Sequence, residues 1–489
     1  MIPTLVLDCC IQGTKTLECK QEVEFEFMKY IRAYYDETPL PFEEIFFHSQ
    51  CPDMPHDMPP MPVFMRGPPQ RPDYPPPPEP DLDPVTPDEM SIMYVMLVHN
   101  HASFAQRIIN ALDEPQHTFV VHVDLKAPTV HAQLVRAAKT FRHRNVFVMD
   151  REFSHRVNWG GFSVVNATLQ AMYFSLQLGR SFHYLQLISG TSYPIKSNLA
   201  IRTELSQHPG AVYMDVSPHP NLPDPVTWFH YVECDDALHR VARLSVPRGI
   251  HMYVGSQWFA VPHHVVRWLV ESPLPFQYAL YAQYVVVADE NFFATLLMNS
   301  PYCGMIVRRN LLFVLFDKWE NEVNQEQGDR DRRKCLSPDP DHCGRSPSTL
   351  TMQFKRLLEA SRASFARKFD PVDSESMALA DVIDRWRDGS TSRAVFGAVG
   401  DEGKSVMVRF SGMREELLSI DMALKGGGGK DGGGGGGVGA GEGESRIEAD
   451  ICWDMSPVPG EPIRMNPCYP SRPGQWFTIG KRLALTAHC

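Results

Sequence analysis

Residues 93–124 read MYVMLVHNHASFAQRIINALDEPQHTFVVHVD, and the fold class follows from the pattern of these residues. The run MYVMLV predicts a short buried strand, and residues 103–112 after it are expected to form a helix. A second apolar run, Thr118–Val123, predicts another strand, which ends at Asp124. Because strands that alternate with helices are typical of a parallel α/β sheet, we expect such a sheet here. Ligands of these sheets bind beyond the carboxyl ends of the strands, where His99 and Asp124 lie.

The alternation of strands and helices continues along the chain. Further strands are expected at 145–149, 184–188 and 311–315, and further helices at 129–141, 162–178, 264–270, 350–359 and 372–390. Residues 209–249 are polar and are expected to be irregular, and residues 254–261 are expected to be a loop that enters a strand. This pattern predicts an α/β domain over residues 93–390.

Composition divides the rest of the chain into smaller parts. Residues 1–51 are expected to form a small α-rich segment with a helix at 22–35. Residues 52–92 are expected to form a proline-rich linker. Residues 391–489 have β character and are interrupted by a glycine-rich insertion at 425–443. The 489 residues are 43% hydrophobic, which suits a globular chain of two or three domains. The net charge of −11 is mild and argues against a general nucleic-acid binder.

The cysteines indicate an oxidising compartment. The chain has 11 of them, and Cys335 and Cys343 bracket a short Pro/Asp loop, which favours a disulfide between these two. The chain contains no run of 18 apolar residues, so we expect no membrane span and no visible anchor in this sequence.

Two neighbouring acids stand in the apolar run VVVADENFFATLLM at 285–298. From Asp289 onward the apolar spacing is helical, so Asp289 and Glu290 lie in a first turn, where negative charge is favourable. One interpretation is structural, with Asp289 as a helix cap and Glu290 in solvent. The other is that Glu290 is a catalytic base in the floor of a pocket. The spacing alone does not decide between them.

Arg367 and Lys368, flanked by two phenylalanines, form a cationic pair. Two such cations can neutralise a diphosphate, although a solvated helix end is an equally good interpretation. Asp124 suits a hydrogen bond to a uracil or ribose, or a cap on the next turn. Three Asp-x-Asp triplets, at 81–83, 329–331 and 339–341, lie in loop-like composition, so we expect no metal clamp. One carboxylate base with a cationic diphosphate site fits inverting glycosyl transfer.

Eight collinear blocks resemble the core-2/I-branching glycosyltransferase family, and within it the protein O-xylosyltransferases. In chain order they are YVMLVHNHAS, VHVDLKAP, VNWGGFSVVNATLQAM, LQLISGTSYPIKS, VGSQWFAV, ADENFFATLLMNSPYC, DHCGRSP and ASFARKF. Together they span about 93–371. The resemblance implies a GT-A-like, Rossmann-type domain that works without a metal or other cofactor, followed by a small C-terminal β-rich domain.

The resemblance also assigns roles to individual residues. It makes Glu290 the catalytic base and Arg367 and Lys368 the diphosphate-binding pair. It implies contacts to the nucleotide sugar from Val98, Asp124, Val157, Asn158, Trp159 and Ser346. Gln257 and Trp258 match an Asp-Trp pair that lines the sugar and acceptor site. The glutamine is a departure, which leaves the donor sugar and the acceptor open.

These assignments predict an enzyme that transfers xylose from UDP-xylose to a serine of a protein acceptor, as in proteoglycan-type linkages. An alternative in the same class transfers N-acetylglucosamine or glucuronic acid to a glycan, and Gln257 keeps it open. A third hypothesis is a catalytically silent glycan-binding protein on the same fold. By resemblance, the expected location is the lumen of the Golgi or endoplasmic reticulum, as a type II membrane protein.

Overall fold

The computed structural model describes residues 11, 13–52, 78, 83–218, 229–315 and 347–387, and the backbone of Ile451–Asp454 and Arg464–Pro467. The chain divides into two compact units, one made of residues 1–392 and 474–489 and the other of residues 393–473. In the second unit, β15 (Ile451–Asp454) and β16 (Arg464–Pro467) form an antiparallel pair. These two strands agree with the β character expected there. The glycine-rich insertion lies outside the described residues.

A mixed sheet forms the centre of the first unit. Within the described ranges it has seven strands, in the order β12 (Ile306–Val307), β6 (Val212–Tyr213), β11 (Ala260–Pro262), β4 (Tyr184–Ser189), β1 (Ile92–Val98), β2 (Thr118–Val123) and β3 (Val146–Val148). The strands from β4 to β3 are parallel, whereas β11 is antiparallel to its two neighbours. Because β2 and β4 are buried along their whole length, their sequences are nearly continuous apolar runs.

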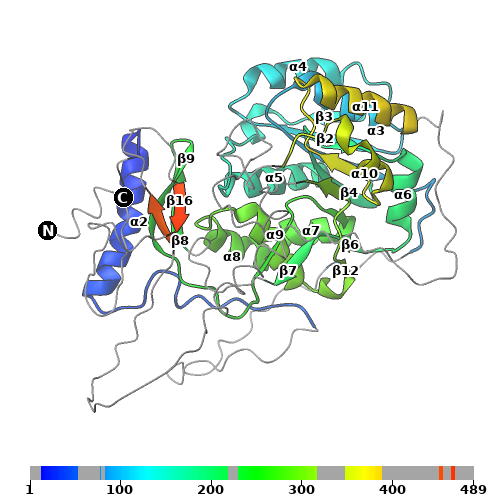
Figure 1. Ribbon diagram of the computed structural model, residues 1–489. Coiled ribbons are helices and arrows are strands. Elements are labelled where there is room, and N and C mark those ends of the chain that lie inside the picture. The colour runs from blue at the N-terminus through cyan, green and yellow to red at the C-terminus, as the bar shows by residue number, and fades with distance from the viewer. Residues whose placement is uncertain are drawn as a thin grey trace, which may run out of the picture. The chain divides into compact units, whose positions relative to one another are not determined.

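Helices cover both faces of this sheet (Figure 1). One side carries α3 (Ala102–Leu112), α4 (Pro128–Ala138) and α11 (Ser374–Arg387), and the other carries α5 (Ser163–Gln177), α7 (His263–Glu271) and α9 (Ala288–Met298). The described part of this domain also contains the helices α6 (Asn198–Ser206), α8 (Pro273–Ala282) and α10 (Lys355–Ala360). The order β1-α3-β2-α4-β3 confirms the predicted α/β class with Rossmann-type alternation.

Two smaller sheets shape the region of the candidate site. In one, β14 (Phe365–Arg367) lies between β13 (Leu312–Val314) and β5 (Tyr193–Pro194). In the other, β10 (Tyr253–Gly255) pairs with β7 (Val216–Pro218). The first of these sheets brings Arg367 to the end of a short strand next to the turn after β4.

The N-terminal helix packs on a β-hairpin of the main domain (Figure 1). Helix α2 (Leu17–Tyr35) contributes Val23, Phe27 and Tyr30 to an apolar cluster with Val232 and Val241 of the hairpin β8 (Phe229–Cys234) and β9 (Ala237–Arg243). Two disulfides, Cys19–Cys234 and Cys51–Cys303, join the N-terminal segment to the main domain. The expected pair Cys335 and Cys343 lies outside the described residues.

One prediction from the sequence is wrong. Residues 209–249 were expected to be irregular, but they contain β6, β7 and the hairpin of β8 and β9. The hairpin mixes apolar and polar residues, and it is held by α2 and by a disulfide to a cysteine 215 residues away. Its stability therefore comes from partners that local sequence does not reveal. Helix α8, which begins at Pro273, was also not anticipated. Within the described part of the chain, no helix is long and apolar enough to cross a membrane.

Candidate active site

The first turn of α9 presents both acids at the edge of the domain core. The residues after them, Phe292, Phe293, Leu296 and Leu297, are buried, which fixes the helix and leaves its N-terminus at the site. Before the helix, Val287 has a left-handed backbone, with φ of 53°, and its N–H donates to the carbonyl of Gly160 at 2.7 Å. The start of α9 is thereby joined to the Trp159-Gly160-Gly161 turn.

Burial makes both acids weaker than usual. It raises the pKa of Glu290 to about 7, with a further increase from the neighbouring Asp289 carboxylate and an opposing effect from Arg367. Burial likewise raises the pKa of Asp289 to about 6, against the effect of Arg367 and of backbone hydrogen bonds. A carboxyl group that titrates near neutral pH suits general-base catalysis better than an exposed glutamate does.

Arg367 lies within electrostatic reach of both acids. Burial lowers its pKa to about 10, while Asp289 and Glu290 oppose this change. Its guanidinium carbon lies 5.0 Å from the ring centroid of Trp258, in a cation–π contact. Among the described residues, Nε of Arg367 and Oδ1 of Asp289 are buried without a hydrogen-bond partner. The site therefore holds unused donor and acceptor capacity, which a bound ligand would satisfy.

The ends of β1 and β2 form the neighbouring part of the site. The N–H of Asp124 donates to the carbonyl of Val98 at 2.9 Å, and Oδ1 of Asp124 accepts from the N–H of Lys126 at 2.8 Å. One carboxylate oxygen of Asp124 thus caps its own turn. Burial lowers the pKa of His99, Asp124 opposes this, and Arg367 and Lys368 add to it. The charges of Asp124 and of the cationic pair therefore both act on His99.

Lys126 lies between the Val157–Trp159 turn and Asp124 and contacts both. Nζ of Lys126 donates to the carbonyl of Val157 at 2.6 Å and to Oδ1 of Asn158 at 3.0 Å, and it lies 4.0 Å from Oδ2 of Asp124. Trp159 is 75% exposed, so its ring does not serve core packing. An exposed tryptophan on a fixed turn is available to stack on a ligand.

The structure thus brings most of the predicted site residues together. Contacts and electrostatic coupling connect Glu290, Arg367, Lys368, Trp258, Asp124, Val98 and the 157–159 turn. Gln257 is half-buried next to Trp258 in the chain. Ser346 lies outside the described residues.

Sequence reasoning missed two polar groups of this region. Asp289 was considered only as a helix cap, and Lys126 was not considered at all, although it follows Asp124 by two residues. His99 was noted at a strand end but was given no role in the predicted site. Its strand-end position was the available signal, and the charges around it come from distant segments.

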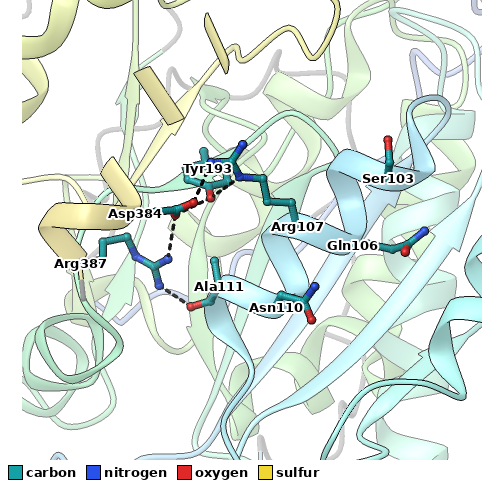
Figure 2. A pocket seen from close by; sticks show the side chains of 8 residues that line it. All are labelled: Ser103, Gln106, Arg107, Asn110, Ala111, Tyr193, Asp384 and Arg387. Carbon is teal, nitrogen blue, oxygen red and sulfur yellow. Dashed lines mark hydrogen bonds and ion pairs between the residues drawn. The ribbon is translucent and has the colours of Figure 1, made fainter. Parts of the chain in front are cut away.

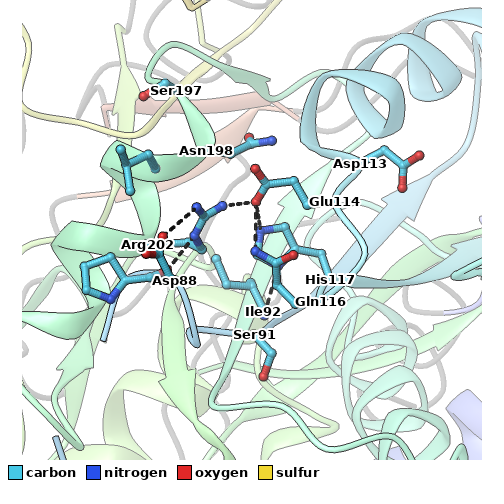
Figure 3. A network of polar contacts seen from close by, with 12 residues as sticks. Asp88, Ser91, Ile92, Asp113, Glu114, Gln116, His117, Ser197, Asn198 and Arg202 are labelled. Atoms are coloured by element: carbon cyan, nitrogen blue, oxygen red, sulfur yellow. Dashed lines mark hydrogen bonds and ion pairs between the residues drawn. The ribbon is translucent and has the colours of Figure 1, made fainter. Parts of the chain in front are cut away.

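Two other polar regions contain none of the predicted site residues. A cavity of about 450 Å³ lies between α3, β5 and α11, and its arginine Arg107 is bonded to Tyr193 and Asp384 (Figure 2). In the network of Figure 3, Arg202 joins Glu114 and Asp88 beside the start of β1, and Glu114 also contacts His117 at 3.2 Å. Because these charges are already paired, we assign both regions to structure.

A third group has the residue types of a metal site. Among the described residues, Cys19, Cys234 and His239 bring their ligand atoms within 4.8 Å of one another. The two cysteines form a disulfide, so their thiolates are not available to a metal ion.

Comparisons with known proteins show which proteins this chain resembles. The chain is similar to xylosyltransferase 2 of Canis lupus familiaris, with 29% identity over 310 residues, which covers 61% of this chain and 34% of the relative. It is also similar to xylosyltransferase 1 of Rattus norvegicus, with 27% identity over 300 residues, which covers 60% of this chain and 35% of the relative. The chain thus spans about a third of the length of these relatives.

The chain also resembles one solved structure and matches one protein family. The apo form of mouse xyloside xylosyltransferase 1 aligns with 48% of this chain and 91% of its own at 11% identity, but its TM-score of 0.27 is too low to support an argument. Residues 92–338 match the family described as "Branch: Core-2/I-Branching enzyme". This match begins at β1 and includes Glu290 but not Arg367. On this evidence, the chain belongs to the Core-2/I-Branching enzyme family.

Proposed function

We propose that this protein is an inverting glycosyltransferase that uses a UDP-sugar. The observation that carries the proposal is the electrostatic coupling of Glu290, a carboxyl group with a pKa of about 7, to the guanidinium of the half-buried Arg367, whose Nε has no partner among the described residues. Transfer of a sugar from a nucleotide needs a base for the acceptor hydroxyl and a cation for the departing diphosphate. Glu290 and Arg367 supply these two groups from one site.

In this mechanism Glu290 takes the proton of the acceptor hydroxyl as that oxygen attacks the anomeric carbon. The new carbon–oxygen bond forms while the bond from the anomeric carbon to the phosphate oxygen breaks, and UDP leaves. Arg367 and Lys368 neutralise the negative charge that develops on the diphosphate. Because two fixed cations do this work, we expect the reaction to need no metal ion.

The nucleotide occupies the ends of β1 and β2. Val98, Asp124 and the Val157–Trp159 turn line this position, and Trp159 offers an exposed ring to the base or ribose. Ser346 remains a further expected contact. Trp258 and Gln257 face the sugar or acceptor, with the Trp258 ring held against Arg367.

We propose xylose as the donor sugar and a serine hydroxyl as the acceptor, because the similar relatives are named xylosyltransferases. A second candidate is transfer of N-acetylglucosamine or glucuronic acid to a glycan. It is favoured by the half-buried amide of Gln257, which donates as well as accepts hydrogen bonds beside the sugar position. We place the enzyme in an oxidising lumen, such as that of the Golgi or endoplasmic reticulum, and the two disulfides support this.

A donor screen with the purified chain tests the proposal. UDP release is measured from UDP-xylose, UDP-N-acetylglucosamine and UDP-glucuronic acid, each with a serine-containing peptide or a glycan acceptor, in EDTA and with added manganese. We expect UDP-xylose to be turned over with the peptide, at the same rate in both buffers. Turnover of another donor would support the second candidate, and the absence of both UDP binding and turnover would refute the enzyme assignment.

A further inference from the structure

Glu233 lies on β8, yet its carboxylate contacts the turn at 158–163. Oε1 accepts a hydrogen bond from Nδ2 of Asn158 at 2.9 Å, and Oε2 accepts from the N–H of Ser163 at 2.9 Å. The hydroxyl of Ser163 also donates to Oε1. A Cβ on Gly161 would collide with this carboxylate, so the glycine lets the carboxylate come against the backbone of the turn.

Lys126 holds the same turn from the side of Asp124. Its ammonium group donates to the carbonyl of Val157 and to Oδ1 of Asn158. The Asn158 side chain therefore bridges the two charged groups, with its oxygen toward the ammonium and its nitrogen toward the carboxylate. This orientation is the one that the two partners permit, because an ammonium only donates hydrogen bonds and a carboxylate only accepts them.

Glu233 is itself fixed by the N-terminal segment. The next residue, Cys234, is bonded to Cys19 of α2, and Asp235 accepts hydrogen bonds from the N–H groups of Lys15 and Thr16. The hairpin of β8 and β9 is therefore tied to α2 at the point where Glu233 emerges. A carboxylate on such an anchored strand can hold the turn in one conformation.

We propose that Glu233 is a positioning residue for donor binding, which keeps the Val157–Trp159 turn in the conformation that receives the nucleotide. This inference rests on the proposed function, in which that turn contacts the donor. Glu233 does not itself touch the donor, because its carboxylate is occupied by Asn158 and Ser163. The N-terminal helix, through the hairpin, then contributes to the affinity for the donor.

The test is the binding of UDP to the Glu233→Gln variant, measured by titration calorimetry on the whole chain. Glutamine keeps the size of the side chain, but its NH2 group does not accept hydrogen bonds, so at least one of the three is lost. We expect the Kd for UDP and the KM for the donor to rise roughly tenfold, since loss of a charge-assisted hydrogen bond leaves the turn less preorganised. The kcat and the KM for the acceptor should stay within about twofold, because Glu290 and the acceptor side are untouched.

Glu271→Gln is the matched control, because Glu271 is an exposed residue of α7 whose carboxylate pairs with Arg267. It should bind UDP like the wild type. Ser163→Ala removes one of the same three bonds, together with the hydrogen bond that the N–H of Asn158 donates to the Ser163 hydroxyl at 2.9 Å, and it serves as the second test variant if Glu233→Gln does not fold. If the wild type binds UDP and the test variants bind it equally well, the role of Glu233 is wrong, whereas the proposed function is unaffected. A wild type that does not bind UDP would overturn the proposed function together with it.

Discussion

Glu290 must be ionised to act as a base, and its pKa of about 7 sets the pH at which this occurs. We predict that kcat/KM rises about tenfold per pH unit below pH 7 and reaches a plateau above it. Initial rates between pH 5 and 9 with the preferred donor give this profile. An acidic limb centred near pH 4.5, the ordinary value for a glutamate, would show that the catalytic base is not this buried group.

The same pKa shift predicts a cost in stability. Because the folded-state pKa of Glu290 is raised above its ordinary value of 4.5, the folded protein holds this proton more tightly than the unfolded chain does. The contribution of Glu290 to the free energy of unfolding therefore falls as the pH rises from 4.5 to about 7, and it stays low above that. We predict that Glu290→Gln is more stable than the wild type at pH 8, by up to about 3 kcal/mol.

Urea unfolding at pH 8 and at pH 4.5 measures this difference, and Glu271→Gln provides the control for an exposed glutamate. The higher free energy of unfolding of Glu290→Gln should be present at pH 8. It should be absent at pH 4.5, where the Glu290 carboxyl of the folded wild type is protonated. An equal difference in stability at both pH values would show that the ionised Glu290 carboxylate does not destabilise the wild type.

In the proposed function, we expect donor binding to depend most on Arg367. We predict that Arg367→Ala weakens UDP binding by about 2–4 kcal/mol, because it removes a charge-assisted contact from a half-buried position. Calorimetric titration with UDP gives this value. Arg267→Ala on α7 is the matched control, since Arg267 is exposed and pairs with Glu271. Unchanged UDP affinity in Arg367→Ala would assign the residue to the solvated, structural role.

At the scale of elements, the turn before α5 is joined to the start of α9, so in the proposed function it connects the donor position to the helix that carries Glu290. Gly160 has a φ of +73° and accepts the hydrogen bond of Val287 at the start of α9. Gly179, at the end of α5, has a φ of +63° and no atom within 4 Å of a Cβ built on it. Substitution by alanine at either position should cost about 1 kcal/mol of stability through backbone strain. We predict that only Gly160→Ala also weakens UDP binding, as measured by calorimetry together with thermal unfolding.

Equal UDP affinities in the two glycine variants would contradict a link between this turn and the donor position. The pair of variants separates that link from strain alone, because both residues have left-handed backbones.

The elements that could be predicted from sequence are those whose own apolar spacing is typical of a strand or a helix. The strands β1, β2 and β4 are apolar runs buried by the sheet, and α9 follows from the spacing of Phe292 and Leu296. The hairpin of β8 and β9 was missed because α2 and a disulfide stabilise it from a distance. Glu290 and Arg367 were found from composition and resemblance. Glu233 was not, because its partner Asn158 lies 75 residues away and no local pattern joins them.

At the scale of the whole molecule, the disulfides Cys19–Cys234 and Cys51–Cys303 tie the N-terminal segment to the main domain. Cys51–Cys303 closes a sequence separation of 252 residues and lies beside the hydrogen bond from Gln50 to Asn299. We predict that the double variant Cys51→Ser and Cys303→Ser loses about 2–4 kcal/mol of stability while it keeps its UDP affinity. Thermal unfolding with and without reductant measures the loss. A melting temperature equal to that of the oxidised wild type would contradict this stabilising role.

The role of Glu290 as the catalytic base is tested most directly by measuring UDP binding and turnover in Glu290→Gln, with Glu271→Gln as the control. Glutamine keeps the shape of the side chain but does not act as a base. We predict a Kd for UDP within about twofold of the wild type and a turnover lower by at least about 100-fold. Turnover equal to that of the wild type would contradict the assignment of Glu290 as the catalytic base.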